Sequence, residues 1–237
     1  MIAMVRAADL VRAAAGALLD LVYPPACAAC GEPAPDGGPF CAICAEAVEP
    51  VPAGCGRCGL PGPDAPCGAC RAAPPAFDSV RAGGLFGGPL ADAIHALKYG
   101  GRPALARPLG SWLATRAPPP EGALVVSVPL ARGRRIERGY DQAALLADAY
   151  ARAAGARGLR ARAALVRTKE TRAQVGLTRE ERARNVAGAF VARAVEGRDI
   201  VLLDDVVTTG ATADAAAAAL RRAGARSIAV VALARAE

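Results

Sequence analysis

The alternation of apolar and polar positions along the chain predicts an α/β protein. Short apolar runs of strand length alternate with longer segments whose apolar residues recur every three to four positions, as on one face of a helix. The clearest strands are expected at 124–128, 200–203 and 228–233, and weaker ones at 163–166 and 189–191. Helices are expected at 89–98, 104–115, 142–154 and 213–223. This order favours βαβ units and a parallel sheet flanked by helices, from about Phe77 onward.

The first 22 residues are expected to form an amphipathic helix. Charged residues interrupt this stretch, so it has the pattern of neither a signal peptide nor a membrane span, and we expect a cytoplasmic protein. Packing against the rest of the protein is the favoured use of the apolar face. The alternative, binding to a membrane surface, is disfavoured because the polar face is not rich in Lys and Arg. The apolar residues at helical spacing are Leu10, Val11, Ala14, Leu18, Leu21 and Val22.

Residues 23–76 differ in composition from both neighbouring segments. They are rich in Cys, Gly and Pro and lack sustained periodicity, and the adjacent Pro74 and Pro75 favour a linker at the end of the segment. We therefore expect three parts: the helix over 1–22, a cysteine module over 23–76 and the α/β domain over 77–237.

All eight cysteines lie between residues 27 and 70, in four CxxC pairs. A CxxC turn directs two thiolates toward one point, and two such turns supply the four sulfur ligands that Zn²⁺ prefers. The pattern CxxCGxP occurs at 27–33 and again at 55–61, each time followed by another CxxC. This duplication favours sequential filling of two sites, although interleaved pairing remains open. The expected ligands are Cys27, Cys30, Cys41 and Cys44 at one site and Cys55, Cys58, Cys67 and Cys70 at the other.

A disulfide framework is the alternative use of these cysteines. The lack of a signal peptide and the presence of an intracellular-type α/β domain oppose it. Four thiolates close the coordination sphere, so both zinc ions are expected to be structural. Within 23–76 the only basic residues are Arg57 and Arg71, which makes this module alone a poor partner for a nucleic acid backbone.

The net charge of +7 and the pI of about 9.2 suggest anionic partners, such as phosphates or nucleic acid. All of the 29 basic residues except Lys98 and Lys169 are Arg, which an Ala- and Arg-rich composition also produces. The global charge is therefore weak evidence, and each arginine is weighed by its context.

The most informative stretch is IVLLDDVVTTGAT at 200–212. Four apolar residues predict a buried strand, two carboxylates follow at its carboxyl end, and a loop of small and hydroxyl residues then opens a helix. Open parallel sheets bind ligands at this place. The loop N–H groups and the helix N-terminus suit a phosphate, whereas the two carboxylates suit hydroxyl groups such as those of a ribose. The alternatives are a buried strand with an acidic cap and a phosphate loop of another class.

This stretch matches, at all thirteen positions, the signature with which type I phosphoribosyltransferases bind phosphoribosyl pyrophosphate (PRPP). Further matching segments are LKYGG at 97–101, VPL at 128–130, RGYDQ at 138–142 and the stretch 167–190. With the cysteine module, they make the chain from about Tyr23 resemble the ComF family, competence-associated proteins with an N-terminal zinc ribbon and a phosphoribosyltransferase domain. The resemblance implies a type I phosphoribosyltransferase-like sheet, PRPP with Mg²⁺ as ligands and a role in DNA uptake.

By this resemblance, Asp204 and Asp205 would hold the ribose hydroxyls and the following loop the 5′-phosphate. The turn after the strand at 124–128 would be the pyrophosphate loop. The family usually has Phe and Asn where this chain has Tyr140 and Asp141, which places a carboxylate beside the expected pyrophosphate site. The implied PRPP-binding residues are Asp204, Asp205, Val206, Val207, Thr208, Thr209, Gly210, Ala211, Thr212, Pro129, Leu130, Ala131 and Arg132.

The polar and basic segment 167–185 lies between two expected strands. It reads either as a solvated helix with ion pairs such as Glu180–Arg184, or as a mobile loop that closes over PRPP and carries cations to the pyrophosphate. We favour the loop. The candidates for contact are Arg167, Lys169, Arg172 and Arg179, of which Arg167 and Lys169 are expected to be catalytic together with Asp204 and Asp205.

The implied reaction is a Mg²⁺-dependent displacement at the ribose C1 that releases pyrophosphate. The rival is a non-catalytic protein of the same fold that handles single-stranded DNA under control of PRPP or a nucleotide. The lack of alternating aromatic residues counts against tight single-strand binding. His95 is expected to be structural or at the surface, and Trp112 in the core. The segment 77–101, expected to cover the base site, does not single out a purine, a pyrimidine or an amine as acceptor, and the oligomeric state is equally open.

Overall fold

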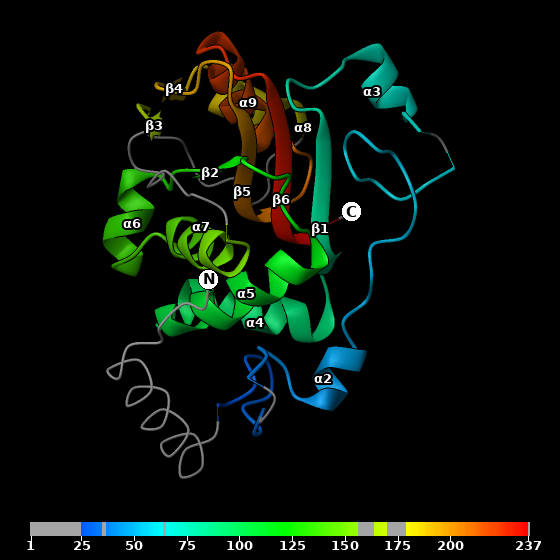
Figure 1. Cartoon of the computed structure of the whole chain (residues 1–237), viewed down its shortest axis with the longest axis vertical. Coiled ribbons are helices and arrows are strands. Elements are labelled where there is room, and N and C mark those ends of the chain that lie inside the picture. The colour runs from blue at the N-terminus through cyan, green and yellow to red at the C-terminus, as the bar shows by residue number, and fades with distance from the viewer. Residues whose placement is uncertain (1–24, 35–36, 64, 156–163, 170–178, 237) are drawn as a thin grey trace, which may run out of the picture.

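The computed structural model describes residues 25–34, 37–63, 65–155, 164–169 and 179–236 (Figure 1). The helix expected over 1–22 lies outside these residues. Among the described helices, none has the length and apolar character needed to cross a membrane.

A four-stranded parallel sheet forms the centre of the α/β domain, as expected. Its strand order is β1-β6-β5-β2, and every neighbouring pair is parallel. The strands are β1 (Ser79–Leu85), β2 (Leu124–Ser127), β5 (Asp199–Val207) and β6 (Ser227–Arg235). β5 and β6 lie in the middle and are buried on both faces, which explains their nearly continuous runs of Val, Ile, Leu and Ala.

Helices cover both faces of the sheet. On one face α4 (Gly88–Tyr99), α5 (Ala106–Arg116) and α7 (Gln142–Ala153) share a core with Val201 and Leu203. On the other face α9 (Ala211–Arg222) packs against Ile200 and Leu202. Alternate residues of β5 thus serve opposite layers, because successive side chains of a strand point to opposite faces. The four helices predicted from periodicity are all present, with the short 3₁₀ turn η1 (Pro103–Leu105) leading into α5.

The sequence did not reveal β1, because Gly83 and Gly84 interrupt its apolar pattern. The structure requires both glycines. A Cβ atom on Gly83 would lie 2.4 Å from the Trp112 ring, and one on Gly84 would lie 2.7 Å from the carbonyl oxygen of Glu49. The two glycines that obscure the strand pattern in the sequence therefore allow α5 and the cysteine module to pack closely against β1.

The two weaker strands form a separate antiparallel pair rather than part of the parallel sheet. They are β3 (Leu165–Arg167) and β4 (Phe190–Ala192), and the two face each other beside α9. Helix α8 (Arg179–Val186) precedes β4, so the described end of the segment 167–185 is helical. Helix α6 (Arg132–Arg138) was also not predicted, since six of its seven residues are charged or glycine and leave no apolar face.

The cysteine module folds as two small units, each with one short helix. The first ribbon, residues 25–48, contains α2 (Ala42–Glu46), and the second ribbon, residues 51–73, contains α3 (Gly68–Ala72). Figure 1 places the first ribbon in blue against α4 and α5, and the second ribbon in cyan alongside β1. Phe40 of the first ribbon packs edge-on against Trp112 of α5, with ring centroids 5.6 Å apart. Trp112 is partly buried and packs against the edge of the core, where it links the first ribbon to the α/β domain.

Candidate functional site

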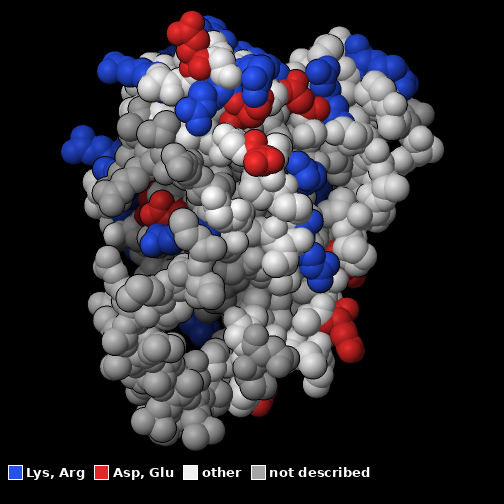
Figure 2. All heavy atoms as spheres, in the orientation of Figure 1, with Lys and Arg blue, Asp and Glu red and all other residues white. Residues whose placement is uncertain are grey.

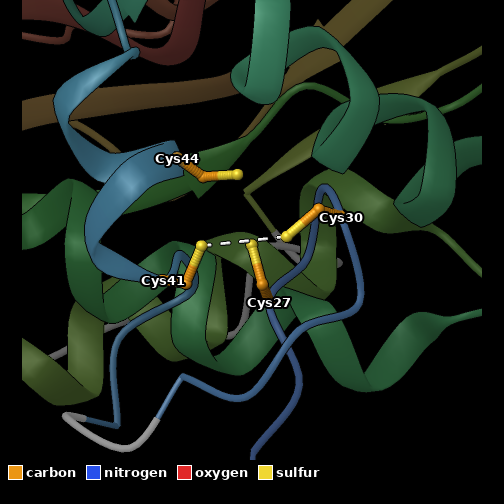
Figure 3. Close-up of side chains that lie close together, drawn as sticks. All are labelled: Cys27, Cys30, Cys41 and Cys44. Atoms are coloured by element: carbon orange, nitrogen blue, oxygen red, sulfur yellow. Dashed lines mark hydrogen bonds between the residues drawn. The ribbon is translucent and has the colours of Figure 1, made fainter.

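The eight cysteines gather into two groups of four. Within each group the Sγ atoms all lie within 4.8 Å of one another. Figure 3 shows the first group, in which two sulfurs come from the turn after residue 26 and two from the start of α2. The groups are Cys27, Cys30, Cys41 and Cys44, and Cys55, Cys58, Cys67 and Cys70. The pairing is therefore sequential, and the interleaved alternative is wrong.

Both groups fit zinc. Four thiolates about 2.3 Å from a central ion are about 3.8 Å apart in a tetrahedron. The Sγ atoms of Cys30 and Cys41 are 3.7 Å apart, and those of Cys58 and Cys67 are also 3.7 Å apart. No cysteine among the described residues forms a disulfide.

The thiols of each group differ in their pKa. Burial raises the pKa of Cys44 and Cys70. Burial also acts to raise the pKa of Cys27 and Cys55, but hydrogen bonds from backbone N–H groups outweigh it and bring both values to about 6. The pKa of Cys30 and Cys58 is raised as well, so each group has one thiol that ionises readily and two that resist, and a central cation would allow all four to ionise.

A separate cleft of about 320 Å³ lies where the parallel sheet ends. It is bounded by the carboxyl end of β5, the start of α9, the turn after β2 and the last turn of α4. This is the position at which open α/β sheets bind ligands. The continuous run Asp204–Ala213 lines the cleft, so nine of the predicted PRPP-binding residues lie together there.

The loop between β5 and α9 leads into a helix N-terminus, a backbone arrangement that can receive an anion. Gly210 is the N-cap of α9 and has φ +79°, a left-handed conformation that glycine adopts without strain. Ala211 and Thr212 begin the helix and line the cleft. The first-turn N–H groups of a helix have no acceptor within the helix, and the helix dipole favours an anion beside them.

The two carboxylates at the end of β5 are not equivalent. Asp205 is buried and lies between two donors: Lys98 Nζ is 2.9 Å from Oδ1, and Gln142 Nε2 donates to Oδ2 at 2.9 Å. Asp204 accepts the N–H of Asp205 through Oδ1 at 2.8 Å. Burial, reinforced by the charge of Asp205, raises the pKa of Asp204 to about 8. Both residues belong to β5, which extends beyond the apolar run of the prediction.

The predicted pyrophosphate loop lies only partly in the cleft. Pro129 and Leu130 line it, whereas Ala131 is buried as the N-cap of α6 and Arg132 is exposed on that helix, away from the lining. Asp141 braces this turn. Its Oδ2 accepts the N–H of Leu130 at 3.2 Å, and its Oδ1 caps α7 by accepting the N–H of Ala144 at 3.1 Å.

Of the cationic residues predicted to contact PRPP, only some line the cleft. Arg167 lines the cleft, with its guanidinium 5.4 Å from the Phe190 ring and 3.5 Å from the carbonyl oxygen of Pro129. Lys169 instead donates to the carbonyl oxygen of Ala187 at 3.3 Å and does not line the cleft. Arg172 lies outside the described residues, as does the side chain of Arg179.

Sequence reasoning missed several residues of the cleft. Lys98, Gln142 and Arg138 lie in segments that carried the family resemblance, so the signal was present, but nothing in their spacing linked them to β5. Tyr99 lies in such a segment as well, and Phe86 lies in the segment 77–101 expected to cover the base site, whereas Arg134 gave no signal. Arg235 was also missed: this buried residue donates to the carbonyl oxygens of Val207, at 2.8 Å, and of Thr208, which supports the loop from β6.

Comparison with protein families matches two parts of the chain. Residues 18–73 match the double zinc ribbon domain, and residues 142–237 match the phosphoribosyl transferase domain. Both matches agree with the geometry of the cysteine groups and of the parallel sheet.

The chain is also similar to curated relatives. The DNA utilization protein YhgH of Escherichia coli strain CFT073 is 33% identical over 180 residues, which is 72% of this chain and 78% of the relative. The proteins of the same name from E. coli K12 and Salmonella typhi match with the same identity and coverage.

Among solved structures, the B. subtilis glutamine phosphoribosylpyrophosphate amidotransferase, in complex with ADP and GMP, aligns with a TM-score of 0.38 and 25% identity. The alignment covers 53% of this chain, which spans only 25% of that protein. At this TM-score the likeness adds nothing to the fold assignment, which rests on the sheet topology and the family model.

Proposed function

Because the chain belongs to the ComF family, in which a double zinc ribbon precedes a phosphoribosyltransferase domain, we propose that it binds PRPP and transfers its phosphoribosyl group with release of pyrophosphate. The relatives are named for DNA utilization, and we propose that the reaction contributes to that process.

One observation carries this proposal: the cleft joins an anion-binding helix start to two carboxylates. The 5′-phosphate would bind at the Thr208–Thr212 turn, because this turn lines the cleft and the start of a helix favours an anion. The ribose hydroxyls, which are donors, then meet the acceptor oxygens of Asp204 and Asp205. The pyrophosphate lies toward Pro129 and Leu130, with Arg167 beside it as a cation.

The reaction in this site is a displacement at the ribose C1. The bond from C1 to the pyrophosphate oxygen breaks and its electron pair leaves with pyrophosphate, while a nitrogen of the acceptor forms the new bond and loses its proton to solvent. The carboxylates stabilise the positive charge that develops on the ribose, and Arg167 stabilises the negative charge on the leaving group. The bracing of the Leu130 turn by Asp141 fixes where that group departs.

Magnesium fits this cleft because its carboxylate oxygens are the hard ligands that the ion prefers. Asp204 would hold it, since the charge of Asp205 is already neutralised by Lys98. When bound, the ion would neutralise charge on the pyrophosphate. The two zinc ions would be held by the cysteine groups and are structural.

Isothermal titration of the zinc-loaded full chain with PRPP and Mg²⁺ tests the binding. We expect saturable binding by the wild type and a loss of at least about tenfold in the Asp204→Asn/Asp205→Asn variant, because amides cannot replace charged acceptors. Asp148→Asn, at an exposed position on α7, is the matched control and should bind as the wild type does. Equal affinity in all three proteins would refute the proposal.

Transfer itself is tested by pyrophosphate release. Purified protein with PRPP, Mg²⁺ and a panel of nucleobases and amines should release pyrophosphate only with the correct acceptor. If the protein binds PRPP but releases pyrophosphate with none of these acceptors, the proposed transferase reaction is wrong and only the proposed PRPP binding stands.

A second candidate function is the handling of single-stranded DNA without catalysis. Helix α6 favours it, since four of its seven residues are arginines: Arg132, Arg134, Arg135 and Arg138. Figure 2 weighs against it, because basic side chains on the visible face are scattered and interrupted by acidic ones. Binding of a single-stranded oligonucleotide that weakens steeply with salt would support this function, because phosphate contacts release counterions.

A further inference from the structure

Three aromatic side chains form a row beside the cleft, which we name the aromatic wall: Phe86, His95 and Tyr99. The rings of Phe86 and His95 have centroids 5.8 Å apart, and those of His95 and Tyr99 are 6.2 Å apart. His95 and Tyr99 are one helical turn apart on α4, so the helix fixes their relation.

The wall is exposed at the mouth of the cleft. Phe86 and Tyr99 both line the cleft together with Asp204 and Asp205, yet 37% of Phe86 and 71% of Tyr99 remain accessible to solvent. Single exposed aromatic residues are common on protein surfaces. Here two of them contact the same His95 ring and line the same cleft, which indicates a surface that a ligand covers.

Arginines accompany the wall. The guanidinium of Arg138 lies 4.7 Å from the centre of the Tyr99 ring, and Arg134 lines the cleft from the same helix. Such a cation beside a ring would repel an ammonium group. It would instead stack on a neutral planar ring and donate hydrogen bonds to oxygen atoms at the edge of that ring.

The end of α4 that carries Tyr99 is joined to the neighbouring elements of the cleft. Each of the last three residues of α4 contacts a different neighbour. The carbonyl oxygen of Leu97 accepts a hydrogen bond from the Tyr140 hydroxyl, and Lys98 forms an ion pair with Asp205. The ring of Tyr99 packs against the guanidinium of Arg138. These contacts hold the end of α4, which carries Tyr99, beside the carboxylates of β5.

We propose that Phe86, Tyr99 and Arg138 form the acceptor subsite and that the acceptor is a planar heteroaromatic base with ring oxygen substituents, not ammonia or an aliphatic amine. The proposal rests on the proposed function. A ring nitrogen of the base attacks the ribose C1, the bond from C1 to pyrophosphate breaks with its electrons on pyrophosphate, and the ring nitrogen loses its proton to solvent.

Calorimetric titration of the zinc-loaded full chain with uracil, hypoxanthine and ammonium chloride tests the subsite. We expect a base to bind and ammonium not to bind. Tyr99→Ala should weaken base binding by about tenfold or more, as loss of one base–aromatic stack does, whereas Tyr99→Phe should retain it. Ile136→Ala is the control, since Ile136 is 72% exposed but does not line the cleft.

The outcomes separate this inference from the proposed function. PRPP binding with no Tyr99-dependent binding of either base overturns the subsite and leaves the PRPP function. Tyr99-dependent base binding without PRPP binding supports the subsite and removes the PRPP function. If a ten-residue oligothymidylate binds in a Tyr99-dependent manner and neither free base does, the wall serves single-stranded DNA and the acceptor proposal is wrong.

Discussion

Lys98 Nζ lies 2.9 Å from Asp205 Oδ1, so the last turn of α4 is joined by an ion pair to the carboxyl end of β5. Both side chains are largely buried, with 16% of Lys98 and 9% of Asp205 accessible. The pair neutralises one of the two carboxylates, and it links the helix that carries Tyr99 to the strand that would hold the ribose.

Replacing Lys98 by Met should destabilise the fold by about 3 kcal/mol, because it leaves the charge of Asp205 buried without its cation. Urea denaturation measures this. The matched control is Arg152→Met, at an exposed pair with Asp148 on α7, which should cost less than about 0.5 kcal/mol. Adding Asp205→Asn to Lys98→Met should recover part of the loss. A Lys98→Met protein as stable as the wild type would show that the pair contributes little.

The raised pKa of Asp204 predicts a stability that falls as the pH rises. Without ligand, the folded protein retains a proton on Asp204 up to about pH 8, whereas the unfolded chain releases it near the ordinary aspartate pKa of 3.8. The folded state is therefore favoured most below about pH 4, and this advantage is lost as the pH rises through about 8, by at most about 1.4 kcal/mol per pH unit.

Urea denaturation of the wild type and of Asp204→Asn between pH 6 and pH 9 isolates this effect, since other groups titrate in both proteins. Relative to the variant, the wild type should lose stability toward pH 9. A difference between the two proteins that stays constant over this range would mean that Asp204 has an ordinary pKa.

The two zinc sites should differ in their effect on the α/β domain. Cys27, Phe40 and Cys44 belong to the same apolar core as α4, α5 and α7, whereas no buried residue of the second ribbon belongs to either core cluster. Cys27→Ser should therefore lower the thermal unfolding temperature more than Cys55→Ser. Metal analysis should find about one zinc per chain in each variant. Equal losses of unfolding temperature would contradict this view of the first ribbon.

The sequence predicted the framework of the site because its signals are local. The strand, two acids and small-residue loop at 200–212 are contiguous, and so are the CxxC pairs, which the structure assembles as expected. What the sequence could not supply were contacts between distant segments. Lys98 carries an ordinary helix-end charge in the sequence, and its role appears only when α4 is placed beside β5.

The failures have physical causes as well. Gly83 and Gly84 weakened the strand pattern of β1 because they serve close packing rather than strand propensity. The strands at 163–166 and 189–191 were recognised, but periodicity does not say which sheet a strand joins, and they pair with each other.

The close approach at Gly83, Gly84 and Trp112 also limits how this protein can change by recombination. A first ribbon taken from a relative would have to bring a matching partner for Trp112 and fit closely against a strand that has no side chain at Gly84. Exchange of the metal-binding part alone should produce chimeras that fold poorly, so the two halves of this chain are expected to have been inherited together.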